Sequence, residues 1–312
     1  MGQPQSRIHE QRHAIQERMA REGLPRFHQL ADELNTVVDE VFGGRIPYDP
    51  LDGADVMTLT FVEKQREHLR SVRLLLDAKQ HRDAYLIART MIEGMGRLLW
   101  AFRRTPERTD LWLRFGAVLD WRQIKSNEAN GMVYTPEDKD QLKAFLDEHG
   151  PRYYTSKVRK AIADAEQAGT PYELPDDPWD YKWTDTTVKK MFTEVEGDEL
   201  YESVYGTSSE WVHWGVRSVL RATDTKERVT PGFTEVDWGL AVHALQLGCQ
   251  SLLQSLEVLD RHFSLGVTER LVELDQKIVN IQMESLPDRA DGRGLGVASN
   301  PEEVGCPGDF PQ

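Results

Sequence analysis

Helical periodicity runs through almost the whole chain and constrains its fold more than any other feature. In residues 235–263, apolar side chains recur at alternating steps of four and three residues, the spacing of a helix with one buried face. These positions are Trp238, Val242, Leu245, Cys249, Leu252, Leu256, Leu259 and Phe263. Strand-like alternation bounded by turn residues is almost absent, so the pattern predicts an all-α fold.

A second long segment, residues 82–103, is apolar on more than one face, which is typical of a central helix with neighbours on several sides. We therefore expect a multi-helix bundle of roughly eight to ten helices, with 82–103 and 235–263 at its centre. The other helices are expected at about 7–22, 25–42, 54–79, 108–129, 136–149, 155–168, 184–195, 198–222 and 267–283.

Glycines and prolines that interrupt the helical pattern divide the chain into three parts. We expect N-terminal peripheral helices in residues 1–52 and a helical bundle core domain in residues 53–284. Residues 285–312, rich in Pro, Gly and acidic side chains, are expected to form a disordered tail. Inside the core domain, prolines and four aromatic residues predict an ordered loop over residues 171–185, because so many aromatics are costly to leave in water.

Composition narrows the classes of partner. The 312 residues carry 52 acidic and 38 basic side chains, a formal net charge of −14, which disfavours nonspecific binding to nucleic acid or anionic lipid. Residues 82–122 are basic and aromatic, however, and leave room for a local anionic ligand or RNA. The sequence shows neither the apolar run of a signal peptide nor the longer one of a membrane span. A disulfide framework is not expected either, since Cys249 and Cys306 are the only cysteines. We therefore expect a cytoplasmic protein with no membrane partner.

A metal-site motif occurs near the N-terminus. His9 and His13 bracket a glutamate in the HExxH pattern of zinc hydrolases. Only eight residues precede His9, and Arg12 would place a cation beside the metal, so we interpret this segment as an exposed polar helix. The sequence contains no phosphate-binding loop, dinucleotide fingerprint or Cys-x-x-Cys pair. We therefore expect no cofactor.

A pair of charges interrupts the most apolar helix. Arg89 and Glu93 lie one helical turn apart in residues 82–103. Buried charges are seldom tolerated unless they are paired or hydrogen-bonded, so the two must serve each other, a group on another helix, or a ligand. An ion pair that fixes helix register in the core is the structural alternative to a functional site.

A second polar pair occurs more than a hundred residues later. Ser209 and His213 lie one turn apart, close enough for a hydroxyl to hydrogen-bond an imidazole. If the two helices meet, Glu93 would orient His213, His213 would act as acid and base, and Arg89 would hold an anion. The alternative is a core histidine satisfied by Ser209 and Glu93.

These two motifs carry a resemblance. The Arg89-x-x-x-Glu93 helix followed by Ser209-x-x-x-His213 resembles domain of unknown function 5677, an uncharacterised family of bacterial all-helical proteins. The resemblance covers residues 61–262, implies a helical bundle and assigns no activity. The chain is more distantly similar to HEPN helical domains, whose ribonucleases carry an Arg and a His on one helix. Here Thr207 and Ser208 stand where that Arg is expected, so Arg89 would have to replace it from another helix.

The sequence thus predicts a helical protein of unassigned activity with a polar site of Arg89, Glu93, Ser209 and His213. One alternative is a HEPN-like ribonuclease in phage defence or a toxin system, and another is a noncatalytic scaffold with an unknown protein partner. The last helix, 267–283, has a stripe of apolar residues that predicts either a docked bundle helix or a homodimer contact. That stripe consists of Val267, Leu271, Leu274, Ile278 and Ile281.

Overall fold

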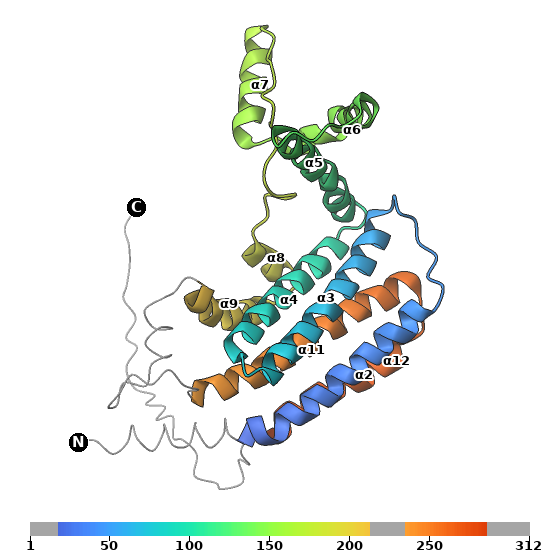
Figure 1. The fold of residues 1–312 in the computed structure, drawn as a ribbon, viewed down its shortest axis with the longest axis vertical. Helices are drawn as coiled ribbons and strands as arrows, with labels where there is room; N and C mark the ends of the chain where they lie inside the picture. The colour runs from blue at the N-terminus through green and yellow to red at the C-terminus, as the bar shows by residue number, and fades with distance from the viewer. Residues whose placement is uncertain (1–17, 213–234, 286–312) are drawn as a thin grey trace, which may run out of the picture.

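A computed structural model of the chain describes residues 18–212 and 235–285 (Figure 1). The regular elements in these residues are ten α-helices, a π-helical turn at Met19–Gly23 and a 3-10 turn at Gly150–Tyr153. Their single β feature is an isolated bridge between Tyr154 and Trp179. The prediction of an all-α bundle is confirmed.

Five long helices lie side by side and form the bundle (Figure 1). They are α2 (Leu24–Gly43), α3 (Gly53–Asp77), α4 (His81–Phe102), α11 (Glu235–Phe263) and α12 (Thr268–Ser285). The most extensive contact between any two helices of the described residues joins α4 to α11, which places both at the centre of the bundle as the sequence predicted.

The apolar face that the sequence predicts for α11 lies at the centre of the core. Leu245, Cys249, Leu252 and Leu259 are fully buried in one cluster with residues of α2, α3 and α4. Complete burial of an aliphatic side chain of this size stabilises the fold by about 1.5–3 kcal/mol. The regular spacing of apolar residues therefore accounts both for the formation of α11 and for its central position.

Helix α2 is also a core helix. Phe27, Leu30, Leu34 and Val38 are buried in the same cluster as the apolar face of α11. Peripheral helices were expected throughout residues 1–52, but the apolar face of α2 packs on α11 and α12. Residues 1–17, with His9 and His13, and the expected tail from 286 onward lie outside the described residues.

The last helix docks on the bundle through its predicted stripe. Leu271, Leu274, Ile278 and Ile281 are buried against the core, where α12 contacts α2 and α11. This is the arrangement that the docked-helix alternative requires. A homodimer through residues 267–283 stays a prediction, and it would have to use residues outside this stripe.

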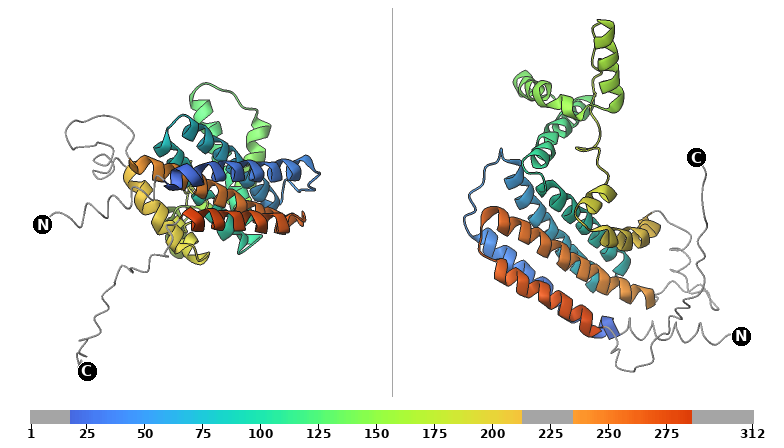
Figure 2. Two further views of the ribbon diagram at one scale, coloured as in Figure 1. Left: turned by 90° about the horizontal axis from the view of Figure 1, so that it is seen from below. Right: turned by 180° about the vertical axis from the view of Figure 1, so that it is seen from behind.

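A helical arm projects from one end of the bundle (Figures 1 and 2). It comprises α5 (Glu107–Ala129), α6 (Pro136–His149) and α7 (Ser156–Ala168). A second apolar cluster at its base includes Trp179 and Trp183 from the expected aromatic loop, whereas Tyr181 of that loop is exposed. The chain then returns to the bundle through α8 (Val188–Glu194) and α9 (Asp198–Val212), which both pack on α4.

A hydrogen-bonded ion pair and a close packing contact hold α8 on α4, and α9 follows α8 in the chain. The buried Arg108 guanidinium lies over the Trp100 ring and bonds the Glu194 carboxylate at 2.7 Å, while the Trp100 indole N–H donates to the same carboxylate at 2.8 Å. Gly96 lets α8 approach, because a Cβ atom at this position would lie 2.4 Å from the Phe192 ring. No helix of the described residues is long and apolar enough to cross a bilayer.

Candidate functional site

The helices that carry the two predicted motifs meet at Glu93. The Tyr205 hydroxyl of α9 donates a hydrogen bond to Oε2 of Glu93 on α4, with an O–O distance of 2.6 Å. Arg97, one turn further along α4, donates to Oε1 from Nε at 3.1 Å and from Nη2 at 2.6 Å. Both oxygens of the carboxylate therefore have charge-assisted or hydroxyl donors, and the carboxylate is held in one orientation.

Glu93 stays ionised at this contact. Burial alone would raise its pKa, but the hydrogen bonds from Tyr205 and Arg97 and the charges of Arg97 and Arg89 outweigh burial and lower it. The Tyr205 pKa is raised by burial and by its bond to Glu93, so the hydroxyl keeps its proton and remains a donor. The site thus contains a fixed negative charge that is already neutralised by Arg97.

Arg89 is held at the same contact by an aromatic face. Its guanidinium carbon lies 4.5 Å from the centroid of the Tyr205 ring, within the range of a cation–π interaction. The Tyr201 ring stacks on the Tyr205 ring, with the two ring centroids 4.3 Å apart. The Nε atom of Arg89 is buried and has no hydrogen-bond partner. An unsatisfied buried donor costs about 1–3 kcal/mol, so Arg89 is under-satisfied in the described structure.

A cavity of about 370 Å³ opens beside Glu93, between α3, α4 and α5. Its lining residues are Thr60, Phe61, Lys64, Gln65, His68, Thr90, Glu93, Gly94, Arg97 and Trp112. The volume lies within the range of small-molecule sites. Its aromatic wall is an edge-to-face pair, Phe61 and Trp112, with centroids 5.5 Å apart.

The charges around this cavity are mostly positive. Lys64 and Arg97 line it, and Glu93 is the single carboxylate among its described lining residues. His68 is also in the wall, and burial together with the Lys64 charge lowers its pKa, which favours the neutral imidazole. An anion is therefore the ligand that best matches the electrostatics of the cavity.

The predicted residues have different outcomes. Arg89 and Glu93 both lie at the α4–α9 contact, but Glu93 pairs with Arg97 rather than with Arg89. Helix geometry favours this choice, because a glutamate followed by a cation four residues later is the better orientation of an i,i+4 pair. Ser209 belongs to α9, one turn after Tyr205, and its side chain is outside the described set. His213 also lies outside the described residues.

Sequence reasoning missed three residues of this site. Arg97 had a detectable signal, since it follows Glu93 by four residues, and Tyr205 precedes Ser209 by the same spacing. Lys64 on α3 had none, because its place beside Glu93 depends on how α3 packs against α4.

The basic and aromatic segment 82–122 is largely occupied by contacts within the chain. Arg97, Arg103, Arg108 and Arg114 form ion pairs with Glu93, Glu196, Glu194 and Asp110, respectively. Less of its positive charge is therefore available to a polyanion than the sequence indicated. In the described part of the chain, no group of three or more histidine, cysteine or acidic side chains could hold a metal ion.

Comparison with known proteins gives one match. The model of a family described as "Family of unknown function (DUF5677)" matches residues 55–229, more than half of the chain. The matched segment begins in α3, contains α4 to α9, and so includes both predicted motifs. Searches of curated proteins and of solved structures found no significant match. The chain belongs to the DUF5677 family of unknown function.

Proposed function

We propose that the protein recognises an anionic ligand beside Glu93, between Arg89 at the α4–α9 contact and the cavity lined by Lys64 and Arg97, and that His213 supplies an acid or base to that ligand. The surplus of positive charge at the α4–α9 contact carries this proposal. Lys64 and Arg97 line the cavity together with Glu93, and Arg89 lies at the α4–α9 contact, where its charge helps to lower the Glu93 pKa.

The cations divide into two kinds. Arg97 is committed to Glu93 by two hydrogen bonds, so these two charges cancel. Arg89 lies against an aromatic ring and has a buried Nε–H with no acceptor, so it retains donors for an anion. A guanidinium group binds carboxylate and phosphate oxygens through several donors in a fixed plane, which suits Arg89 to this role.

The acid/base group would come from the segment that follows Tyr205. Ser209 is four residues after Tyr205 and His213 is eight residues after it. An imidazole titrates near neutral pH, which makes His213 the best-matched proton donor or acceptor of the predicted set. In this proposal Glu93 is a positioning residue, because it holds Tyr205 and Arg97 in place.

Calorimetric titration of the full chain with pyrophosphate and with a short single-stranded RNA tests the binding step. Arg89→Ala is expected to weaken binding of the recognised probe at least tenfold. Arg73→Ala is the matched control, since Arg73 of α3 is also partly buried but pairs with Asp32 of α2. The proposal fails if the wild-type chain binds neither probe, or if both variants weaken binding equally.

RNA cleavage is a second candidate function, and one observation favours it. Helix α4 places Arg89 directly against α9, the helix that precedes His213 in the chain. This supports the idea that Arg89 replaces the arginine that HEPN-like ribonucleases carry before their histidine. His213→Ala should then abolish cleavage of single-stranded RNA at an unchanged melting temperature. RNA left intact by the wild-type protein over a range of metals and pH values would remove this candidate.

A further inference from the structure

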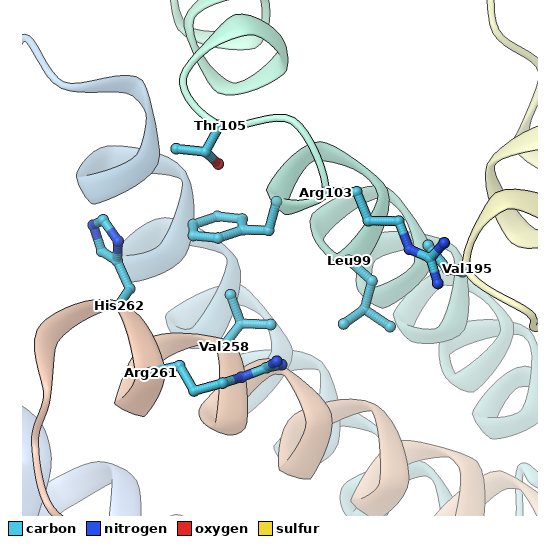
Figure 3. Close-up of a pocket in the computed structure, with 8 residues that line it drawn as sticks. Leu99, Arg103, Thr105, Val195, Val258, Arg261 and His262 are labelled. Carbon is cyan, nitrogen blue, oxygen red and sulfur yellow. The ribbon is translucent and has the colours of Figure 1, made fainter.

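A second cavity lies where the C-terminal ends of α4 and α11 meet the turn between α8 and α9 (Figure 3). We propose that it binds an amphipathic organic anion, an acyl or aryl carboxylate with an apolar body. The cavity volume is about 490 Å³. Its lining residues are Leu99, Phe102, Arg103, Thr105, Val195, Val258, Arg261 and His262.

Two of the residues that line the cavity are arginines. Arg103 comes from the end of α4 and Arg261 from the last turn of α11, and no carboxylate is present among the described lining residues. In a chain with a net charge of −14, two arginines at one hollow are a marked local excess of positive charge. Cations are also expected at helix C-termini because of the helix dipole, but the dipole does not account for the hollow between these two.

Both arginines are free to turn toward a ligand. The Arg103 Nη2 atom lies 3.4 Å from Glu196, and the two side chains are 49% and 87% exposed. Such an exposed pair adds little to stability, so a ligand anion can replace Glu196. Arg261 donates from Nε to the backbone carbonyl of Glu257 at 3.2 Å, which leaves its terminal nitrogens uncommitted by that bond.

The other walls are apolar. Leu99 of α4 and Val258 of α11 face each other across the cavity in Figure 3, and Val195 closes it from the turn after α8. Phe102 completes this apolar side. A ligand with an apolar body between these side chains and an anionic head near one of the arginines matches both kinds of lining residue.

His262, another lining residue, is held by contacts with α3 and α4. His262 pairs with Asp55 of α3 at 2.6 Å, and its ring packs edge-on against Phe102 with centroids 5.5 Å apart. These two contacts fix the position of His262 in the lining.

This cavity is separate from the one beside Glu93. The two share no lining residue, and Leu99 follows Glu93 by six residues, about 9 Å along α4. The inference therefore goes beyond the proposed function, and either site can fail a binding test without affecting the other.

Calorimetric titration of the full chain with octanoate and with octylamine tests the proposal. The two probes have the same apolar chain and opposite charges, so we expect octanoate to bind and octylamine to bind at least tenfold more weakly. Combined Arg103→Glu and Arg261→Glu substitutions should weaken octanoate binding at least tenfold. They should leave pyrophosphate binding at the cavity beside Glu93 unchanged.

Arg159→Glu is the matched control. Arg159 lies on α7, is 46% exposed, and like Arg103 it pairs with an exposed carboxylate, Asp185. Octanoate should bind this variant with wild-type affinity. The proposal is overturned if octanoate does not bind, if octylamine binds as tightly, or if the Arg159 variant loses as much affinity as the double variant.

Discussion

Replacing Tyr205 by phenylalanine removes one hydroxyl group and leaves the ring that supports Arg89. The hydroxyl donates to Oε2 of Glu93 at 2.6 Å, so the variant leaves a half-buried carboxylate with Arg97 as its remaining side-chain donor. The Glu93 pKa, which this hydrogen bond helps to lower, should rise toward its ordinary value. The variant therefore tests stability and electrostatics at the α4–α9 contact together.

The expected loss of stability follows from the character of the bond. A hydrogen bond to a charged group contributes about 1.5–3 kcal/mol. The Glu93 side chain is 31% exposed, so water partly replaces the lost donor and the value belongs at the lower end. We expect Tyr205→Phe to lower the free energy of unfolding by about 1.5 kcal/mol near pH 7.

The loss should depend on pH in a definite direction. A carboxyl group with a lowered folded-state pKa stabilises the fold above its unfolded pKa, and this stabilisation disappears as the pH falls through the folded value. Because Tyr205→Phe reduces the lowering at Glu93, the stability difference between wild type and variant should be full above about pH 5 and shrink toward pH 4. Urea unfolding at pH 7 and at pH 4 measures this difference.

Tyr153→Phe is the control for this experiment. Its hydroxyl donates to the neutral backbone carbonyl of Leu111 at 2.8 Å, so its loss should cost about 1 kcal/mol at either pH. A double-mutant cycle of Tyr205→Phe with Glu93→Gln should give a coupling energy of at least about 0.5 kcal/mol. A Tyr205 effect that is absent, identical at both pH values, or uncoupled from Glu93 would refute the reasoning.

Four further substitutions are tested by urea unfolding. Arg108→Ala should cost about 1.5–3 kcal/mol because it removes the hydrogen bonds that the buried guanidinium donates to the Trp100 carbonyl and the Glu194 carboxylate, and a loss below about 1 kcal/mol would contradict this role. His68 has a lowered pKa from burial and a neighbouring lysine, so wild-type stability should fall as the pH drops below about 6.5, and His68→Gln should flatten that dependence. Gly96→Ala should cost at least about 2 kcal/mol because its new methyl group meets the Phe192 ring, whereas Gly116→Ala meets nothing within 4 Å and should stabilise α5 by about 0.5–1 kcal/mol. Equal effects of the two alanines would show that helix propensity rather than packing controls these sites.

Helix positions were predictable because the buried face of a helix determines the spacing of the apolar residues along its sequence. The stripe through Leu245, Leu252 and Leu259 predicted α11 and its central place, and both were confirmed. The same local signal did not show that α2 belongs to the core. Its position depends on contacts with α11 and α12, which begin only at Glu235 and Thr268, whereas α2 ends at Gly43.

The candidate site was predictable in part for the same reason. Periodicity identified Arg89 and Glu93 as charges on a buried helix, and the structure places both at a helix contact. Periodicity shows which residues share a face of one helix, but not which face of another helix meets them. The partner Tyr205, 112 residues after Glu93, therefore came only from the tertiary structure.

The central claim is that Arg89 at the α4–α9 contact is the cation that receives an anion. The most direct test is the ¹⁵N resonance of the Arg89 Nε atom, followed by NMR while pyrophosphate is added to the full chain. The account predicts a saturable shift of this resonance, with the Nε resonance of Arg73 unchanged because that guanidinium is already paired with Asp32. An Arg89 resonance that does not move, or that moves no more than that of Arg73, would contradict the claim.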